Sequence, residues 1–395
     1  MRGFPRSDRR MPERFQVSRR LRLVGAALTT LLVMVAFMSL GPAGHTSAQA
    51  TVKQAYLWAN EPSTDAYTPD ERYQYNTTGE LNTVTRTGVG VYVVNLPGMV
   101  KEGNSQVTAT SSSDAGVALG SVCAIVTNPT AENGALQQTV NCYDTDGAPA
   151  DSGFLLLSTQ GDVFLGSYSA YLYANDRSAE AYTPDEHYQF NSTGAANTIT
   201  RTAVGSYTVT LPGLGVERGN IQVTSANDTP GISCLVANWG IAEDQAKTVN
   251  VSCFDANAQP FDAPFTLLHV VGSTSSDEAM VWPRGAYVFM GHGEQADRHV
   301  PNQAYQFNST GAANEAEWLD TGHYYVHLPG LGVEGGTFLV TAVVGQYGLE
   351  TTANACSMPR WLLDEENMVI EVSCFGPDGT PQNSAFNVMY VIPEP

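Results

Sequence analysis

The chain carries three copies of one sequence pattern. The segment Tyr-Gln-Tyr-Asn-Thr-Thr-Gly, which begins at Tyr73, returns in similar form at Tyr188 and Tyr305, at offsets of 115 and 117 residues. A Leu-Pro-Gly tripeptide at 96–98, 211–213 and 328–330 keeps those offsets. This period is too long for solenoid or propeller repeats, whose units need neighbours to bury a core. We therefore predict three tandem domains at residues 51–160, 164–275 and 280–395. Each is expected to have its own core, and short linkers are expected to join them.

The hydrophobic pattern within each copy has a period of two. Residues 92–96, 207–211 and 324–328 alternate Tyr, Val and Leu with more variable residues, as in a strand with one buried face. In the first copy we expect further strands at residues 54–59, 83–87, 106–110, 122–127, 139–143 and 154–157. Seven or eight such strands in about 110 residues match an immunoglobulin-like sandwich. The predicted fold class is all-β, with three tandem immunoglobulin-like antiparallel β-sandwich domains after an N-terminal signal segment.

Six cysteines recur as one pair per copy. Six cysteines allow 15 pairings, and the repeat favours bonds within copies. The predicted disulfides are Cys123–Cys142, Cys234–Cys253 and Cys356–Cys374. Reactive or metal-bound thiols are the alternative, which the lack of a C-x-x-C motif disfavours.

The first 50 residues resemble an export leader. Arg19, Arg20 and Arg22 precede an uncharged run at 23–40, and an Ala-x-Ala ends at Ala50. This order predicts a signal peptide cleaved after Ala50, and a retained membrane anchor is the alternative. We expect a secreted or cell-surface protein that meets a membrane only through residues 23–40, if the leader is not cleaved.

The charge balance narrows the range of partners. The chain has 19 Lys and Arg against 39 Asp and Glu, a formal charge of −20. Such a surface repels phosphate backbones, so we expect no nucleic-acid binding. The expected partner is an extracellular polymer or protein of unknown identity.

Matching loops in the first two copies hold the candidate ligand-binding residues. These are Tyr67, Asp70 and Glu71 in the first copy and Tyr182, Asp185 and Glu186 in the second. Paired carboxylates beside a tyrosine can bind a cation or hydrogen-bond sugar hydroxyls. The loop acids can equally be solvated or paired with a base, which is their more common role.

An arginine is lost from the third copy together with the acids. Arg86 and Arg201 match each other, and Trp318 takes their place in the third copy. We therefore predict ion pairs of Arg86 with Asp70 or Glu71, and of Arg201 with Asp185 or Glu186. Trp318 is expected to cover the equivalent place without charge.

Metal and cofactor signals are weak. Four histidines, at 292, 299, 323 and 327, fall in the third copy. His323 and His327 are expected on the wet face of a strand, about 13 Å apart, which is too far for one metal ion. The acidic segment at 144–147 is interpreted as a hairpin turn, since a full calcium loop is missing. Each Asn-x-Thr-Gly, as at Asn76, is interpreted as a turn capped by the Asn amide with Gly at positive φ. We expect no metal and no cofactor.

The repeated motifs carry a family resemblance. The runs Tyr-Gln-Phe-Asn-Ser-Thr-Gly, Gly-x-Tyr-x-Val-x-Leu-Pro-Gly and Val-x-Val-x-Cys-Phe-Asp are similar to those of exported repeat proteins of actinobacteria and similar bacteria. The resemblance covers nearly the whole chain after residue 50. It implies an all-β extracellular protein, and it implies no activity and no functional residue.

Three functions follow as hypotheses. The first is a non-enzymatic exported protein for extracellular binding, adhesion or envelope scaffolding, because no catalytic motif is found in the sequence. The second is an array of carbohydrate-binding modules, and the third is a glycan-acting hydrolase that uses Asp70 or Glu71. The candidate stacking rings of the second are Tyr56, Trp58, Tyr171, Tyr173, Tyr287 and Phe289. Their alternation more simply places one ring of each pair in the core.

Overall fold

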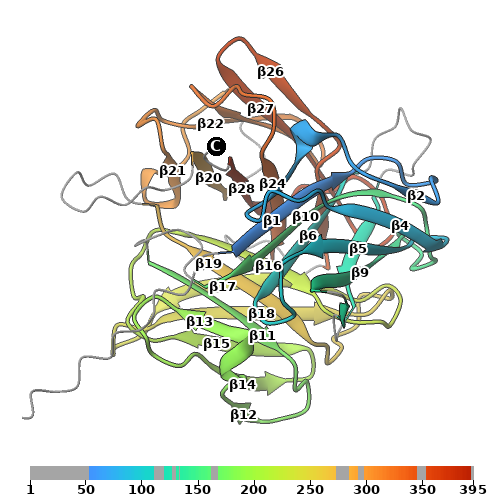
Figure 1. The fold of residues 1–395 in the computed structure, drawn as a ribbon. Coiled ribbons are helices and arrows are strands. Elements are labelled where there is room, and N and C mark those ends of the chain that lie inside the picture. The colour runs from blue at the N-terminus through green and yellow to red at the C-terminus, as the bar shows by residue number, and fades with distance from the viewer. Residues whose placement is uncertain are drawn as a thin grey trace, which may run out of the picture. The chain divides into compact units, whose positions relative to one another are not determined.

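The computed structural model describes residues 53–110, 120–126, 130–132, 134–161, 168–272, 284–291, 298–344 and 353–392. The predicted leader at 1–50, the connections at 162–167 and 273–283, and His292 lie outside these residues. The described chain is all-β, as predicted, and its only helical elements are three short 3-10 turns (Figure 1). These turns are η1 (Glu71–Tyr73), η3 (Glu186–Tyr188) and η4 (Gln303–Tyr305).

The first repeat folds into two antiparallel sheets, a β-sandwich-like arrangement. One sheet has the order β3-β1-β10-β6, and the other has the order β2-β4-β5-β9-β7 with β8 beside β9. The first sheet contains β1 (Lys53–Ala59), β3 (Gln74–Asn76), β6 (Asn104–Thr110) and β10 (Gly153–Gln160). The second contains β2 (Ala66–Tyr67), β4 (Thr83–Gly88), β5 (Val91–Pro97), β7 (Val122–Ile125), β8 (Thr130–Glu132) and β9 (Ala135–Tyr143). All seven strands predicted for this repeat are present.

The second and third repeats have the same pair of sheets. The second repeat has β11 (Ser169–Ala174), β13 (Gln189–Asn191), β16 (Asn220–Ser225) and β19 (Phe265–Val270) in its first sheet. Its other sheet has β12 (Ala181–Tyr182), β14 (Thr198–Ala203), β15 (Ser206–Leu211), β17 (Ser233–Ile241) and β18 (Lys247–Phe254). The third repeat has β20 (Gly285–Met290), β21 (Gln306–Asn308), β24 (Thr337–Val343) and β28 (Ala385–Val391). Its other sheet has β22 (Glu315–Asp320), β23 (His323–Leu328), β25 (Ala355–Ser357), β26 (Trp361–Asp364) and β27 (Asn367–Phe375).

Backbone contacts join the three repeats in cyclic order. In each contact, a residue two positions after the first cysteine of one repeat meets a residue in, or directly after, the strand of the next repeat that is equivalent to β6. The pairs are Ile125 with Ala226, Val236 with Val343, and Met358 with Ala109. The second of these merges two sheets into one of nine strands. Because the third contact returns to the first repeat, the repeats close around an approximate threefold axis.

Three buried threonines repeat the cyclic order. Each hydroxyl accepts a backbone N–H from a neighbouring repeat. The bonds run from Val107 N to Thr224 Oγ1 at 3.1 Å, from Val223 N to Thr341 Oγ1 at 3.1 Å, and from Val340 N to Thr108 Oγ1 at 2.9 Å. The same device therefore links every pair of repeats.

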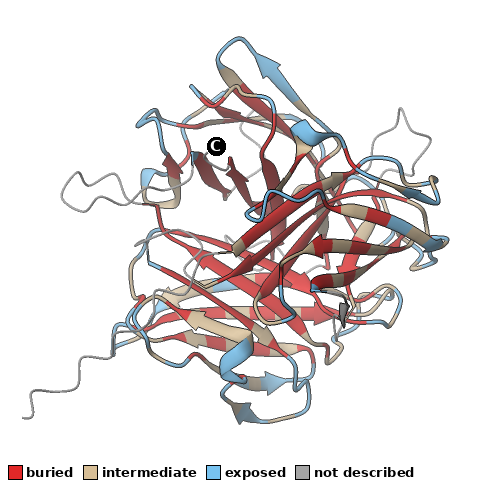
Figure 2. Ribbon diagram, viewed as in Figure 1, coloured by how far each residue is buried: buried red, intermediate tan, exposed pale blue. Residues whose placement is uncertain are grey.

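Each repeat has an apolar core built mainly from its own strands, and a further apolar cluster draws residues from all three repeats. Its members include Tyr56 and Leu157 of the first repeat, Tyr171 and Leu268 of the second, and Tyr287 and Met389 of the third. All eight residues of β10 are buried (Figure 2), so its sheet is covered on both faces. One face belongs to its own sandwich, and the other packs against the neighbouring repeats.

The predicted disulfides are confirmed. Each joins directly opposed residues of neighbouring strands, with Cα atoms 4.0 Å apart in all three. Disulfides of this kind indicate an oxidising environment. Within the described part of the chain, no helix has the length and apolar character needed to cross a membrane.

The Asn-x-Thr-Gly turn is also confirmed. The Asn76 Oδ1 accepts the Thr78 N–H at 3.0 Å, and Gly79 has φ +77°. The Asn76 amide group donates to Asn82 Oδ1 at 3.0 Å and to the Pro97 carbonyl at 2.9 Å. The side chain therefore ties this turn to the Leu-Pro-Gly segment, which explains why the two motifs recur together.

Candidate functional site

The predicted ligand loops fold as capped 3-10 turns. The Asp70 carboxylate accepts the Arg72 backbone N–H at 3.0 Å and also binds the Arg72 guanidinium, with Nη2 to Oδ2 at 2.8 Å. These bonds lower the pKa of Asp70 to about 2. The Tyr67 hydroxyl accepts the Glu61 N–H at 3.3 Å, whereas the Glu71 side chain is exposed.

The second and third repeats use the same cap. Asp185 accepts the His187 N–H at 2.9 Å, and Asn302 accepts the Ala304 N–H at 2.9 Å. The Tyr182 hydroxyl accepts a backbone N–H, as Tyr67 does, and Glu186 is exposed. An amide serves as well as a carboxylate in this role, so the cap explains the repeated side chain without a ligand. Ligand binding at these loops stays a prediction.

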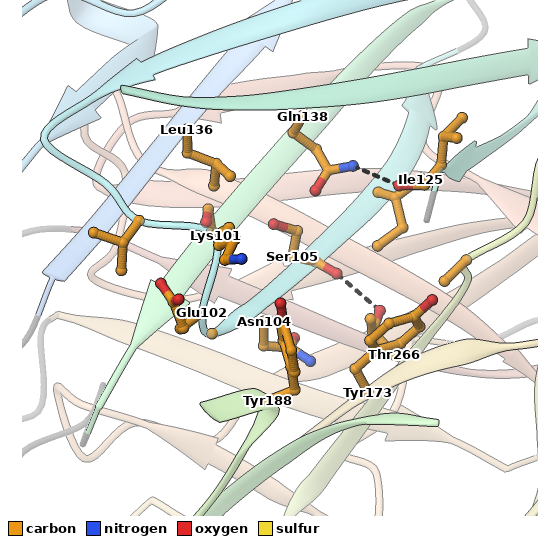
Figure 3. Close-up of a pocket in the computed structure, with 15 residues that line it drawn as sticks. Lys101, Glu102, Asn104, Ser105, Ile125, Leu136, Gln138, Tyr173, Tyr188 and Thr266 are labelled. Atoms are coloured by element: carbon orange, nitrogen blue, oxygen red, sulfur yellow. Dashed lines mark hydrogen bonds between the residues drawn. The ribbon is translucent and has the colours of Figure 1, made fainter. Parts of the chain in front are cut away.

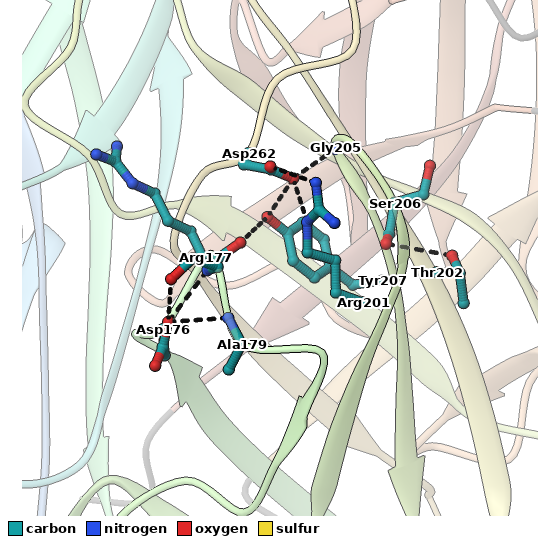
Figure 4. Close-up of polar contacts among 10 residues, drawn as sticks. Asp176, Arg177, Ala179, Arg201, Thr202, Gly205, Ser206, Tyr207 and Asp262 are labelled. Atoms are coloured by element: carbon teal, nitrogen blue, oxygen red, sulfur yellow. Dashed lines mark hydrogen bonds and ion pairs between the residues drawn. The ribbon is translucent and has the colours of Figure 1, made fainter.

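The predicted partners of the two arginines are wrong. Arg86 binds Asp151, with Nε to Oδ1 at 2.9 Å and Nη2 to Oδ2 at 2.8 Å. Arg201 binds Asp262 in the same way, at 2.9 and 2.7 Å (Figure 4). These aspartates lie more than 60 residues along the chain, in the segments that lead into β10 and β19. Asp70 instead takes its own neighbour Arg72 as its partner.

Each aspartate is the centre of a small polar cluster. Asp262 Oδ1 also accepts the Gly205 N–H at 2.8 Å and the Tyr207 hydroxyl at 3.2 Å (Figure 4). The hydrogen bond from Arg201 lowers the pKa of Asp262, although partial burial acts in the opposite direction. The cluster joins β14, β15 and the segment before β19, so it fixes the end of the sandwich.

The third repeat keeps this cluster without charge. Trp318 Nε1 donates to Asn383 Oδ1 at 3.1 Å, and the same oxygen accepts the Gly322 N–H at 2.8 Å. Arginine and its acid are therefore replaced together, as we expected of partners. The expectation that Trp318 covers the place without charge is confirmed, and only the identity of the acid was wrong.

The histidines of the third repeat lie among acids. His323 Nε2 is 2.9 Å from Glu371 Oε1, and His327 Nε2 is 3.5 Å from Glu317 Oε2. The prediction that His327 is a surface residue is wrong, since it is only 7% exposed. Glu317, from the neighbouring strand β22, lies over it. Within the described residues, no group of three or more His, Cys, Asp or Glu side chains has the geometry for a metal ion.

Half of the candidate stacking rings are buried between repeats. Tyr56, Tyr171 and Tyr287 are at most 5% exposed. Their hydroxyls accept N–H groups from a neighbouring repeat, those of Gly336, Gly161 and Gly272 respectively. They therefore do not form an exposed platform for a sugar.

The other three candidate rings are Trp58, Tyr173 and Phe289. Two of them pack against a tryptophan of a neighbouring repeat. Trp239 of the second repeat packs against Phe289 of the third, with centroids 4.8 Å apart. Trp361 of the third repeat packs against Trp58 of the first, at 4.6 Å. Each tryptophan lies five residues after the first cysteine of its repeat. These two interfaces are closed in the same way.

Among the described residues, a small pocket lies beside the equivalent ring pair of the third interface. Tyr173 and Tyr188 of the second repeat border a pocket against Ile125, Leu136 and Gln138 of the first (Figure 3). We call this pocket the interface hollow. Its cavity volume is about 30 Å³, which is room for one or two water molecules.

The sequence of the first repeat differs from the other two at the tryptophan position. The first repeat has Asn128 where the others have tryptophan, five residues after Cys123. Asn128 itself lies outside the described residues.

The hollow combines apolar walls with a few polar groups. Gln138 lies four residues before the second cysteine, where the other repeats have the buried Val249 and Ile370. Its Nε2 donates to the Val126 carbonyl at 3.2 Å and to the Thr139 carbonyl at 3.0 Å. The other polar residues of the lining include Lys101, Glu102, Asn104, Ser105, Ser158 and Thr266. Ligand pockets commonly pair apolar walls with a few placed polar groups.

One buried amine marks the second repeat. Lys247 stands where the first repeat has Leu136, and it is 1% exposed. Its Nζ donates to the carbonyls of Val216 and Glu217 at 3.0 and 3.2 Å. Burial lowers its pKa from 10.5 to about 8. Both of its bonds go to backbone carbonyls, so it ties a loop to the sandwich.

The hollow was missed from the sequence, although a signal for it is present. A tryptophan follows the first cysteine at the same distance in two repeats and is replaced in one. The opposing strand changes from Val and Ile to Gln138 at the same interface. Two coupled departures from a repeat indicate a local change in packing.

Comparison with models of protein families, with curated proteins and with solved structures finds no match for this chain. The function is therefore argued from the hollow and from the contacts around it.

Proposed function

We propose that this is an exported, non-enzymatic binding protein whose ligand site is the interface hollow. The observation that carries the proposal is a difference between equivalent interfaces. Trp239 and Trp361 pack against the ring pairs of two of them, whereas a pocket lies beside Tyr173 and Tyr188 among the described residues of the third. The pocket lies between two repeats and pairs apolar walls with a few polar groups, as ligand sites commonly do.

Export is part of the proposal. The leader-like sequence at 1–50 and the three disulfides support a secreted or cell-surface location. We also keep the immunoglobulin-like topology of each repeat as a proposal, supported by the two sheets per repeat.

Binding is favoured over catalysis by the engagement of the polar groups. Asp70 and Asp185 cap turns, Asp151 and Asp262 pair with arginines, and the Lys247 amine donates to carbonyls. A hydrolase needs an acid and a base or nucleophile that are free to face a substrate. These contacts leave the binding role as the better account of the chain.

The test compares ligand capture by the secreted protein with capture by a variant whose hollow is filled. Glycans and cell-envelope fractions are screened first. Asn128→Trp restores the residue that closes the other interfaces, and Asn60→Trp, at an exposed position, is the matched control. We expect binding by the unmodified protein and by Asn60→Trp, and loss of binding in Asn128→Trp.

Two results would contradict the proposal. One is binding that Asn128→Trp leaves unchanged, which would move the site elsewhere. The other is substrate turnover that Asp70→Asn or Glu71→Gln abolishes, which would make the protein a hydrolase. Glycan, ester and peptide panels measure that turnover.

A further inference from the structure

We propose that a second pocket, between the second and third repeats, binds the carboxylate of a small hydroxylated molecule, the chemistry of a uronic acid sugar. It is lined by Arg218 and Gly272 of the second repeat and by residues of β20, η4, β21 and the loop at 311–313 of the third, and we call it the Arg218 pocket. Its cavity volume is about 320 Å³, within the range of about 300–1,000 Å³ for small-molecule sites. Among the described residues it shares no lining residue with the interface hollow, so the inference goes beyond the proposed function.

Close packing between the two repeats forms the base of the Arg218 pocket. The Gly272 N–H donates to the Tyr287 hydroxyl at 3.3 Å, and the rings of Tyr287 and Phe307 stack with centroids 5.7 Å apart. A Cβ atom at Gly272 would lie 2.2 Å from the Phe307 ring, so only glycine fits between the repeats here. Both rings are buried. The base is therefore held in place by contacts within the protein.

Amide side chains of the third repeat form part of the wall. The Gln306 Nε2 donates to the Pro301 carbonyl at 2.7 Å, and its Oε1 accepts the Asn314 N–H at 2.8 Å. The Asn308 Nδ2 donates to Asn314 Oδ1 at 2.9 Å. Gln303, by contrast, is exposed, and its carboxamide makes no hydrogen bond to any described residue. It can therefore offer both a donor and an acceptor to a ligand.

Arg218 supplies a positive charge without a counterion. Its side chain is exposed, and it pairs with no Asp or Glu in the part of the chain that the structure describes. The neighbouring Glu217 accepts the Tyr305 hydroxyl at 3.3 Å instead. Burial raises the pKa of Tyr287 to about 12, and the charge of Arg218 acts in the opposite direction, so the guanidinium lies near the base of the pocket. A guanidinium can bind a carboxylate through two parallel N–H donors.

The charges of this pocket differ from those at the equivalent places of the other two interfaces. Two positions are compared, the residue before the glycine that precedes the strand equivalent to β6, and the first residue of the 3-10 turn in the next repeat. The residues at these positions are Glu102 with Glu186, Arg218 with Gln303, and Gly335 with Glu71. The second pair alone has a cation and no acid. It places a positive site in a protein whose formal charge is −20.

This arrangement favours a monocarboxylate with hydroxyl groups over a phosphate. The protein's net charge repels a dianion about twice as strongly as a monoanion, and the pocket has a single guanidinium to offset that repulsion. The Gln303 carboxamide can hydrogen-bond sugar hydroxyls. A uronic acid carries one carboxylate and several hydroxyls. A free uronic acid and the end residue of an acidic polysaccharide share this chemistry, and a methyl glycoside represents the second source.

The experiment titrates the whole protein, with its disulfides intact, with four probes at low salt. The probes are glucuronate, methyl β-glucuronide, glucose and glucose 6-phosphate, and binding is measured by calorimetry and ligand-observed NMR. We expect saturable binding of glucuronate that is at least about tenfold tighter than binding of glucose, because the neutral sugar lacks the charge-assisted hydrogen bonds to Arg218. Glucose 6-phosphate should also bind more weakly than glucuronate. Raising the salt concentration should weaken glucuronate binding.

Two substitutions test the assigned residues. Arg218→Gln should lower the affinity for glucuronate to that for glucose. Gln303→Glu introduces the acid of the other repeats beside Arg218, so it should have the same effect. Arg177→Gln is the matched control, since Arg177 is exposed, pairs with no described acid and changes the net charge by the same amount. All three positions are exposed, and an unchanged midpoint of urea unfolding shows that each variant is folded.

Several outcomes would overturn the inference. They are equal affinities for glucuronate and glucose in the unmodified protein, an equal loss in Arg177→Gln and Arg218→Gln, and tighter binding of glucose 6-phosphate than of glucuronate. Binding of methyl β-glucuronide as well as glucuronate supports the proposal with the end of a polysaccharide as ligand, and binding of glucuronate alone supports it with a free sugar acid. Failure of this inference leaves the proposed function intact, because the two pockets lie at different interfaces.

Discussion

Thr224→Val tests whether the three repeats are one cooperative ring. The Thr224 hydroxyl accepts the Val107 N–H at 3.1 Å and donates to Gln106 Oε1 at 2.8 Å, and both partners belong to the preceding repeat. Valine keeps nearly the same shape and removes only the hydroxyl, so the variant measures the hydrogen bonds between repeats without opening a cavity.

The magnitude follows from the groups left unpaired. Thr224 is 5% exposed and Gln106 is 1% exposed, so water cannot replace the lost partner. A buried donor or acceptor without a partner costs about 1–3 kcal/mol. With one donor and one acceptor orphaned, we expect the free energy of unfolding to fall by about 2–6 kcal/mol.

The other two interfaces calibrate this value. Thr341 makes the same pair of bonds, with Val223 N and Gln222 Oε1, so Thr341→Val should lose a similar amount. Thr108 accepts the Val340 N–H, but the third repeat has Leu339 in place of the glutamine. Thr108→Val should therefore lose only about 1–3 kcal/mol.

The assay is equilibrium urea unfolding with the disulfides intact. Thr200→Val, at an exposed position of β14, is the control and should change stability by less than about 0.5 kcal/mol. A closed ring predicts one transition whose midpoint falls in the three interface variants. Unchanged midpoints in Thr224→Val and Thr341→Val, or three independent transitions in the unmodified protein, would refute the reasoning.

Three further outcomes are expected. Asp262→Asn should cost about 1 kcal/mol at neutral pH, because Arg201 loses a partly exposed counterion. Because the pKa of Asp262 is lowered in the folded protein, the difference in stability between the unmodified protein and Asp262→Asn should vanish in urea titrations as the pH falls through the folded pKa. Adding Arg201→Trp, which introduces the residue of the third repeat, should recover stability at neutral pH. Replacing both Cys234 and Cys253 by serine should lower the free energy of unfolding by about 3 kcal/mol, and peptide mapping of the unreduced protein should show no bond between repeats. The pKa of Lys247 is about 8 in the folded protein, against an ordinary value of 10.5. Between these values the unfolded chain binds more protons than the folded protein, so the free energy of unfolding should rise with pH. A Lys247→Met variant with the same rise between pH 8 and 9.5 would contradict this.

The local features were predictable because they depend on neighbours in sequence. Alternating burial along β5 follows from the alternation at 92–96, and the turn at Asn76 follows from the preferences of Asn and Gly. The disulfides were predictable for a related reason. Three copies with one spacing left a single pairing that all of them could share.

The long-range contacts were not predictable in the same way. The sequence pattern did not distinguish among several acidic residues as the partner of Arg86, and the actual partner, Asp151, is distant in the chain. The closed ring did have a signal in the run Phe154-Leu155-Leu156-Leu157, whose lack of alternation indicates a strand buried on both faces. The run was predicted as a strand with one buried face, so the packing of its second face against the neighbouring repeats was missed.

A ring of covalently linked copies can specialise one interface at a time. In a symmetric trimer of identical chains, a substitution such as Trp to Asn at an interface occurs three times and weakens all three contacts. Here the sequence departs from tryptophan at one of three equivalent positions, Asn128, while Trp239 and Trp361 pack into the other two interfaces. The threonine and backbone links through Thr224 and Ile125 still join the first and second repeats. A tandem repeat can therefore open a pocket between two copies without giving up the ring that positions its walls.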